Sequence, residues 1–331
     1  MSSVTLGSPA IPFAQALPFG ADKPWLAPLA GYSDLPFRLL CREYGAAVCE
    51  TEMVSAKGLL YASPGTEELL HTTPADQPLV GQLFGADPLC LGRATELLQR
   101  KGFVWFDLNL GCSVPKVMRQ GAGAALLGQE DMLLHAAQTM IHAAGFGRVG
   151  FKLRLGLDRT HPVLPDLALR LEDLGAGWIS VHPRTAREGF QGKARWEVLP
   201  LLAKRLSIPL VASGDLFSAA DGLRCLEETK VSAVMYARGA LRNPAIFSDH
   251  RRLLAGQAPS ENDALHIRTM IERHIHLIRE HAPQMSSTWK MRSVIPRYVH
   301  GLPGARALRQ ALCSCTTWQE LEKILNTFLP T

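Results

Sequence analysis

The stretch WFDLNLGCSVPKV, residues 105–117, passes from an apolar run into a loop that carries a cysteine. The run at 105–111 is short and strongly apolar, which is typical of a strand buried on both faces in a parallel sheet. Asn109 lies near its end, and Cys112 follows three positions later. In α/β barrels the chemistry takes place at the carboxyl ends of the strands. A thiol in this position therefore predicts a functional role for Cys112.

Runs of the same kind recur along the chain, and helix-length patterns such as 87–102 and 130–145 separate them. The seven other runs are 24–31, 46–53, 78–85, 149–156, 178–184, 209–216 and 231–241. Alternation of strand and helix predicts right-handed βαβ units and a parallel sheet. Eight units predict an α/β fold of the (β/α)8 TIM-barrel type. A doubly wound open sheet is the alternative, although it would usually show fewer repeats.

The pattern changes after Leu241. A last barrel helix leads into a segment rich in Gly, Pro and Ser near 255–260. The residues beyond it read as amphipathic helices, for example at 262–281 and 316–329, with no strand pattern between them. We therefore expect three parts, which are a lead-in at 1–23, a catalytic barrel at 24–254 and a small all-helical C-terminal domain at 260–331.

Composition excludes several classes of protein. Of the 331 residues, 47% are hydrophobic and 20% are charged, so a sizeable core is available. No apolar run approaches the ~18 residues that a membrane span needs, and the start of the chain lacks the basic region of a secretory signal. The 7 cysteines form no C-x-x-C pair, which argues against a disulfide framework or a structural metal site. A reducing, cytoplasmic location fits these features.

The charge of the chain is uneven. The net charge is +5, and the part from Ala245 onward holds 11 Lys and Arg against 7 Asp and Glu. A basic C-terminal part suggests an anionic partner. A solvated helical face would show the same excess, and composition alone favours that interpretation.

The ends of the expected strands carry a set of polar and small side chains. In chain order they are APLAG (27–31), Gln82, Asn109, Lys152, His182, Arg184, Ser213-Gly214-Asp215 and Ala237-Arg238. The last two groups are turns of the kind that hold a phosphate after strands seven and eight of a barrel. Lys152 on a buried strand needs an anion or acceptor as partner. A phosphorylated, electron-rich ring would provide one.

Several motifs together resemble the tRNA-dihydrouridine synthases. They are LAPLAGYSDLPFR (26–38), GQLFGADP (81–88), DLNLGCSVPKV (107–117), FKLRLG (151–156), VHPRT (181–185), ASGDL (212–216), RGAL (238–241) and NPAIF (243–247). The tail at 290–312 is similar to the helical domain of the bacterial B-type branch. The resemblance extends over roughly residues 24 to 325.

The resemblance implies a flavin barrel with a helical RNA-binding domain. Such an enzyme reduces the C5–C6 bond of selected uridines in tRNA, with FMN as hydride carrier and NADPH as reductant. FMN would contact Pro28, Leu29, Ala30, Gln82, Lys152 and His182, and its phosphate Ser213, Gly214, Asp215, Ala237 and Arg238. Asn109 and Arg184 would bind substrate in the barrel, and Lys290, Arg292, Arg297, Tyr298 and Arg306 would contact RNA through phosphates or by stacking on a base.

The resemblance also places the family's catalytic cysteine on Cys112. Reduction of uracil delivers a hydride to C6 and a proton to C5. A thiol is protonated at neutral pH and is still a moderate acid, which suits the second delivery. Three residues depart from the family pattern: Ser113 replaces a proline, Ser213 an asparagine and Ala237 a glycine. We expect these changes to adjust the properties of the site and to leave the class of reaction unchanged.

A second glycine-rich stretch, GAGAALLG (121–128), resembles a dinucleotide fingerprint but lacks its third glycine. We interpret it as a tight turn that leads into a helix, and we assign no NADPH site to it.

Two other functions remain open. An FMN barrel oxidoreductase acting on a free pyrimidine would share the barrel site but would not need a basic tail. A non-catalytic RNA-binding protein would have no reason to keep Gln82, Lys152, His182 and Cys112 together. The sequence does not exclude ribosomal RNA as substrate, implies no stable protein partner and leaves the oligomeric state open.

Overall fold

A computed structural model describes residues 16–261, 263–282 and 292–329 of the chain. Eight parallel strands form a closed barrel, because β2 pairs with both β1 and β4. A short extra strand, β3 (Val54–Ser55), pairs with β4 beyond the end of β2. The barrel strands are β1 (Trp25–Leu26), β2 (Val48–Glu50), β4 (Leu79–Phe84), β5 (Trp105–Leu110), β6 (Val149–Arg154), β7 (Trp178–His182), β8 (Leu210–Ser213) and β9 (Ala233–Tyr236). The predicted TIM barrel is confirmed, and the open doubly wound sheet is wrong.

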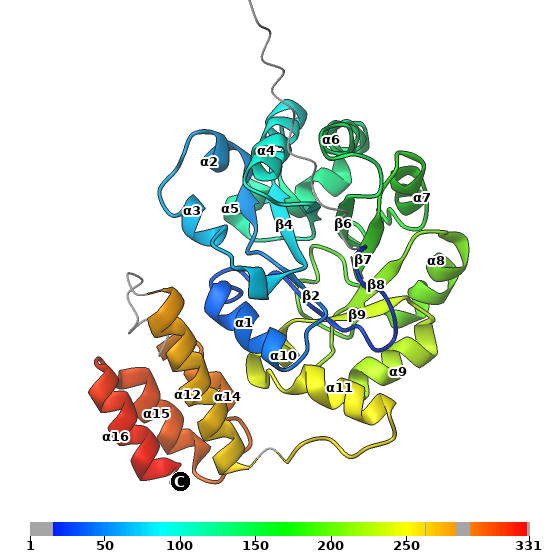
Figure 1. The fold of residues 1–331 in the computed structure, drawn as a ribbon. Helices are drawn as coiled ribbons and strands as arrows, with labels where there is room; N and C mark the ends of the chain where they lie inside the picture. The colour runs from blue at the N-terminus through cyan, green and yellow to red at the C-terminus, as the bar shows by residue number, and fades with distance from the viewer. Residues whose placement is uncertain (1–15, 262, 283–291, 330–331) are drawn as a thin grey trace, which may run out of the picture.

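Helices surround the barrel (Figure 1). They are α1 (Leu35–Glu43), α2 (Ala56–Leu60), α3 (Thr66–Leu69), α4 (Pro88–Arg100), α5 (Pro115–Met118), α6 (Glu130–Ala144), α7 (Asp166–Asp173), α8 (Leu199–Arg205), α9 (Ala219–Thr229), α10 (Arg238–Arg242) and α11 (Ile246–Leu254). Side chains of Asp34, Asp87 and Ser218 cap the first turns of α1, α4 and α9, which explains where these helices begin. The expected strand at 231–241 is shorter than predicted, since α10 already begins at Arg238.

The amino-terminal end of the barrel is closed by aromatic rings. The rings of Trp25 and Trp178 lie 5.8 Å apart, and Phe19 from the lead-in packs 5.0 Å from Trp25. Trp105 completes this layer. Because side chains alternate along a strand, Trp105 in the interior places Asp107 and Asn109 in the interior as well. The barrel is therefore plugged at one end, and its polar interior opens toward the carboxyl ends of the strands.

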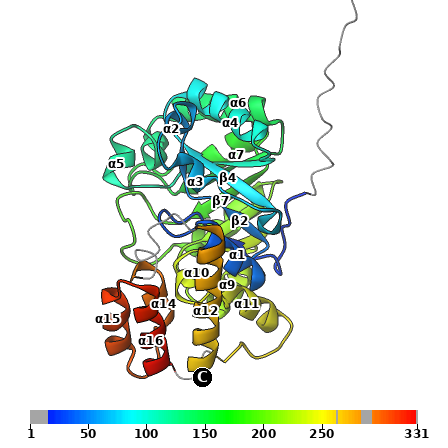
Figure 2. The same cartoon turned by 60° about the vertical axis from the view of Figure 1, so that its left-hand side comes forward.

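The C-terminal helices pack beside the barrel at α1 and α10 (Figures 1 and 2). They are α12 (Ala264–His281), α14 (Ile295–Tyr298), α15 (Ala305–Ser314) and α16 (Trp318–Phe328). The ring of Phe37 on α1 lies 5.9 Å from His274 on α12, and Arg273 forms an ion pair with Glu43. Among the described residues, no helix combines the length and the apolar character needed to cross a bilayer.

Candidate functional site

A cavity of about 250 Å³ lies at the carboxyl ends of the strands. It is lined by Ala27, Pro28, Leu29, Ala30, Met53, Gln82, Asn109, Gly111, Cys112, Ser113, Val114, Lys152, Arg154, His182, Phe190, Ser213, Gly214, Asp215, Leu216, Phe217, Ala237 and Arg238. Every residue that we expected to contact the cofactor lies in this lining, together with Asn109 and Cys112. The structure thus brings together side chains that are up to 210 positions apart in the sequence.

Cys112 lies on the loop between β5 and α5 and is partly buried. Its N–H donates to Asn109 Oδ1 at 2.9 Å, and the N–H of Gly111 donates to the same oxygen at 3.2 Å. Its carbonyl accepts a hydrogen bond from Ala124 N at 2.9 Å. Asn109 thereby fixes the loop that presents the thiol to the cavity.

The glycine-rich stretch at 121–128 supports this loop from behind. Gly123 has a φ of +63°, and a Cβ there would lie 2.6 Å from the carbonyl oxygen of Cys112. Only glycine allows this approach. The segment Gly123–Gly128 is a 3-10 turn that precedes α6, which confirms the predicted tight turn.

Beneath the cavity, Gln82 joins two acidic residues to Asn109. Its Nε2 donates to Asp107 Oδ2 at 2.8 Å and to Glu50 Oε2 at 3.1 Å, and its Oε1 accepts from Asn109 Nδ2 at 2.9 Å. Glu50, Gln82 and Asp107 are fully buried. Sequence reasoning missed both acids, although a carboxylate inside an apolar run is a detectable signal.

Burial lowers the pKa of Lys152, and attraction to Glu50 and Asp107 acts in the opposite direction. Burial raises the pKa of Asp107 to about 7, against the opposing effects of Gln82 and Lys152. Burial and repulsion from Asp107 raise the pKa of Glu50 well above its usual range. Attraction from Glu50 and Asp107 therefore favours the charged form of Lys152, and the sequence argument, which gave Lys152 a ligand as partner, did not foresee these two acids.

Arg184 lies behind the cavity and not in its lining. It is 1% exposed and forms two hydrogen bonds to Asp215, with Nη1–Oδ1 at 2.9 Å and Nη2–Oδ2 at 2.6 Å. It also donates to the carbonyls of Gln191 and Gly192. In this structure the guanidinium of Arg184 anchors Asp215 and the neighbouring loop, so its expected contact with substrate stays a prediction.

Asp215 has a φ of +56° and lies at the turn after β8. Although burial acts to raise its pKa, hydrogen bonds from Arg184 and from Ala194 N lower the pKa overall. Arg238 Nη2 lies 3.3 Å from Asp215 Oδ1, and the guanidinium carbon lies 4.3 Å from the Phe190 ring centroid and 4.8 Å from that of Phe217. Arg238 thus remains a cation at the cavity wall, stacked between two rings.

His182 is neutral in this environment. Burial is the main cause that lowers its pKa to about 2, and the cations Lys152, Arg154, Arg184 and Arg238 add to the effect. Arg184 Nη1 lies 3.1 Å from His182 Nε2. Since a guanidinium can only donate, Nε2 accepts and the ring proton is on Nδ1.

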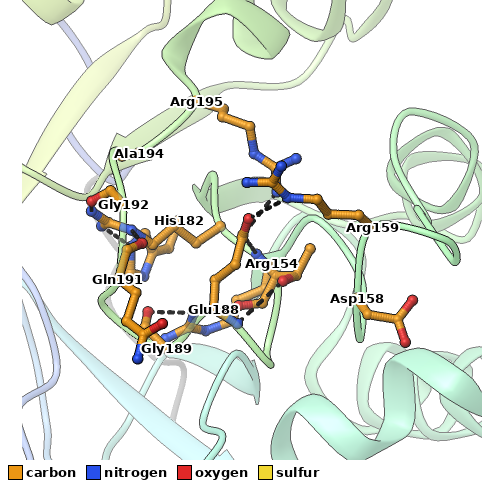
Figure 3. Close-up of polar contacts among 12 residues, drawn as sticks. Arg154, Asp158, Arg159, His182, Glu188, Gly189, Gln191, Gly192, Ala194 and Arg195 are labelled. Atoms are coloured by element: carbon orange, nitrogen blue, oxygen red, sulfur yellow. Dashed lines mark hydrogen bonds and ion pairs between the residues drawn. The ribbon is translucent and has the colours of Figure 1, made fainter.

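The loop at 185–192 is tied to the barrel by buried cations and Glu188 (Figure 3). Arg154 donates to the carbonyls of Thr185 at 2.8 Å and Gly189 at 2.9 Å. Glu188 accepts hydrogen bonds from Arg159 and Arg195, each at 2.9 Å. These contacts hold Phe190, which is 61% exposed, at the rim of the cavity with its ring stacked 6.0 Å from that of His182. The sequence reasoning identified neither Arg154 nor Phe190.

The tail residues lie away from the cavity lining. Tyr298 is 1% exposed and its hydroxyl bonds to His274 Nδ1 at 2.9 Å, so in this structure its ring packs inside the helical part and its stacking on a base is not supported. Arg292 and Arg306 are exposed, and Lys290 lies outside the described residues. Arg297 Nη2 donates to the hydroxyl of Tyr32 at 2.6 Å, and the guanidinium carbon lies 4.7 Å from that ring. Arg297 therefore connects the helical part to the β1–α1 loop.

Two cysteines of the helical part, Cys313 and Cys315, lie at the end of α15. Within residues 16–261, 263–282 and 292–329, no group of three or more His, Cys, Asp or Glu side chains could hold a metal ion. Cys315 is buried and Cys313 is exposed, and both are free thiols.

Comparisons with known proteins agree with this geometry. The family model "Dihydrouridine synthase (Dus)" matches residues 25–330. The "Probable tRNA-dihydrouridine synthase 1" of Synechocystis sp. is 31% identical over 92% of this chain and 86% of its own. The "tRNA-dihydrouridine synthase B" of Pseudomonas aeruginosa is 33% identical over 68% of this chain and 67% of its own.

Solved structures share the fold at low sequence identity. "Morphinone reductase" superposes with a TM-score of 0.50 at 12% identity and covers 73% of this chain and 87% of its own. The "6-hydroxypseudooxynicotine (6-HPON) amine oxidase (HisD)" of Pseudomonas geniculata superposes with a TM-score of 0.52 at 13% identity, over 75% of this chain and 50% of its own. Both likenesses concern the barrel fold alone.

Proposed function

The chain belongs to the dihydrouridine synthase family, and we propose that it reduces the C5–C6 double bond of uridines in tRNA. The observation that carries the proposal is the position of Cys112. The thiol lies on the rim of the cavity whose wall holds Gln82, Lys152 and Arg238. An acid facing a binding cavity is what protonation of a bound base requires.

The residues present fit an FMN molecule. Arg238 at one end of the cavity offers a cation for a phosphate, and the amides of Gln82 and Asn109 at the other end offer neutral hydrogen-bonding groups for a ring. A Cβ at Gly214 would approach His182 to 2.6 Å, so glycine is required for the compact wall between these ends. When bound, FMN supplies the hydride that adds to C6 of the uracil, with NADPH as the source of electrons.

The protein side chains have separate tasks in this reaction. Cys112 gives its S–H proton to C5, and the thiolate takes a proton from solvent afterwards. His182 is a poor candidate for the same task, because it is neutral and its Nε2 already accepts from Arg184. Asn109 holds the Cys112 loop through its Oδ1, and Lys152 provides positive charge in the cavity wall. Exposed basic residues of the helical part, Arg292 and Arg306, support binding of RNA phosphates.

The two half-reactions provide the test. The purified protein should release FMN on denaturation, and NADPH should reduce the bound flavin under anaerobic conditions. Unmodified tRNA should then re-oxidise it, with dihydrouridine detected by mass spectrometry. Cys112→Ala should keep the first half-reaction and slow the second by ~10²- to 10⁴-fold. The matched control is Cys90→Ala, because Cys90 lies on α4 outside the cavity lining and should leave both rates unchanged.

Other outcomes would support a different function. A protein that neither contains nor takes up FMN would contradict the proposal and favour a non-catalytic RNA-binding role. Re-oxidation by a free pyrimidine but not by tRNA would favour the alternative oxidoreductase. Formation of dihydrouridine by Cys112→Ala at the wild-type rate would remove the thiol from the mechanism.

A further inference from the structure

The middle layer of the barrel interior contains charged and polar side chains. Glu50 on β2, Asp107 on β5 and Lys152 on β6 lie in the interior above the aromatic plug, and Lys152 also lines the cavity. Such layers in TIM barrels are mostly branched apolar residues. Burying charges here is costly unless hydrogen bonds compensate, so the layer calls for a functional explanation.

A chain of hydrogen bonds leads from this layer to the Cys112 loop. At the upper end, the N–H of Cys112 donates to Asn109 Oδ1. Asn109 Nδ2 then donates to Gln82 Oε1, and Gln82 Nε2 donates to Asp107 and Glu50. Every donor points away from the loop and toward the acids.

Both ends of the chain fix its direction. A backbone N–H can only donate, and an ionised carboxylate can only accept. If Asn109 turned its amide over, Nδ2 would face two backbone N–H groups, and Gln82 would have to turn over as well. The Gln82 oxygen would then face Asp107 and Glu50 at hydrogen-bond distance and would repel any ionised oxygen there. The acids therefore select one orientation of both amides.

The charge state of Glu50 and Asp107 is compatible with this single orientation of the two amides. The oxygens that Gln82 contacts are Asp107 Oδ2 and Glu50 Oε2, whereas Asp107 Oδ1 and Glu50 Oε1 are buried without a hydrogen-bond partner among the described residues. A proton taken up by the pair can lie on one of these remaining oxygens. Gln82 then keeps its acceptors, and one proton does not reverse the chain.

We propose that Asp107, assisted by Glu50, is a positioning residue that orients Gln82 and Asn109 and so holds the Cys112 loop in its hydrogen-bonded conformation. The inference deepens the proposed function, on which its catalytic consequence rests. The orientation of the loop can be tested without turnover, so a failure of either idea can be recognised separately.

The test uses three variants of the full-length protein as purified. Asp107→Leu removes the acceptor, and Asp107→Asn keeps one acceptor oxygen for Gln82. Leu108→Ala is the matched control, because Leu108 is buried on the opposite face of the same strand and its loss weakens the core without touching the chain. Amide hydrogen exchange is measured at Cys112 and expressed relative to the exchange of β5 amides. Alkylation of Cys112 by iodoacetamide is measured relative to Cys90.

We expect Asp107→Leu to raise the relative exchange of Cys112 roughly tenfold, since one hydrogen-bonded link is lost. Asp107→Asn should stay near wild type, and Leu108→Ala should not change the ratio even if the protein is less stable. The alkylation ratio should change in Asp107→Leu alone. Equal ratios in all variants would overturn the proposal, as would an Asp107→Leu effect that Leu108→Ala reproduces.

The catalytic arm separates positioning from cofactor binding. Because the same amides face the flavin ring, the assay is run at saturating FMN; Asp107→Leu should then still be reduced by NADPH, and re-oxidation by tRNA should slow at least tenfold. If exchange and alkylation respond as expected but wild type does not act on tRNA, the positioning role stands and the proposed function fails. If Asp107→Leu re-oxidises at the wild-type rate, the positioning role has no part in the reaction.

Discussion

The neutral state of His182 predicts that the protein without bound FMN loses stability in mild acid. A free imidazole has a pKa of about 6.5, whereas burial and the neighbouring cations hold that of His182 at about 2. Between these values the unfolded chain binds a proton that the folded protein does not. The free energy of unfolding therefore falls as the pH drops below about 6.5. At pH 5 the loss from this residue is ~2 kcal/mol, from 1.5 pH units at ~1.4 kcal/mol each.

Urea unfolding at pH 5.0 to 7.5 measures this loss. His182→Gln cannot take up the proton, so the stability of wild type relative to this variant should decrease by ~2 kcal/mol between pH 7.5 and pH 5. His135→Gln is the control, because His135 is an exposed residue of α6 that lies outside the cavity lining. The comparison also removes contributions from other histidines. If wild type and His182→Gln respond equally to pH, His182 is protonated in the folded protein and the reasoning fails.

Two further predictions concern the tail and the cavity wall. If Arg292 and Arg306 contact phosphates, changing either one to Ala should reduce the slope of log affinity for tRNA against log salt concentration by about one unit. Arg170→Ala on α7 is the control and should leave the slope unchanged. An unaltered slope in both tail variants would remove these residues from the RNA contact. Arg184→Met should lower the free energy of unfolding by ~3–5 kcal/mol, because it leaves Asp215 without its buried partner. Calorimetric unfolding measures this loss, and Arg205→Met is the control because Arg205 forms an exposed ion pair with Asp166. Similar losses in both variants would contradict the prediction.

The barrel was predictable because its signal is local and repeated. Each run such as 105–111 is apolar enough for a strand buried on both faces, and helical patterns separate the runs. The lengths of the individual strands were less predictable. The run at 46–53 forms β2 only over Val48–Glu50, and β3 begins at Val54. The role of Phe19, which packs under the barrel against Trp25, follows from tertiary contacts and has no periodic signal.

The residues lining the site were predictable where strand alternation determines their direction. Gln82, Asn109 and Lys152 all lie on strands, and all line the cavity. Arg184 lies beyond the end of β7, where alternation no longer applies, and it turns back to Asp215. The burial of the Tyr298 side chain depends on its packing against His274. The sequence of a short helix cannot reveal such a contact.

The charged groups around the cavity differ in how far they are engaged by neighbouring groups. Glu50, Asp107 and Lys152 lie together beside Gln82 and Asn109. Arg154 and Arg184 are largely occupied by loop carbonyls and Asp215.

Arg238, by contrast, keeps 36% of its side chain exposed. We therefore expect the anionic group of a ligand to lie toward Arg238. This orientation leaves the uncharged part of the ligand beside the amides and within reach of the Cys112 loop.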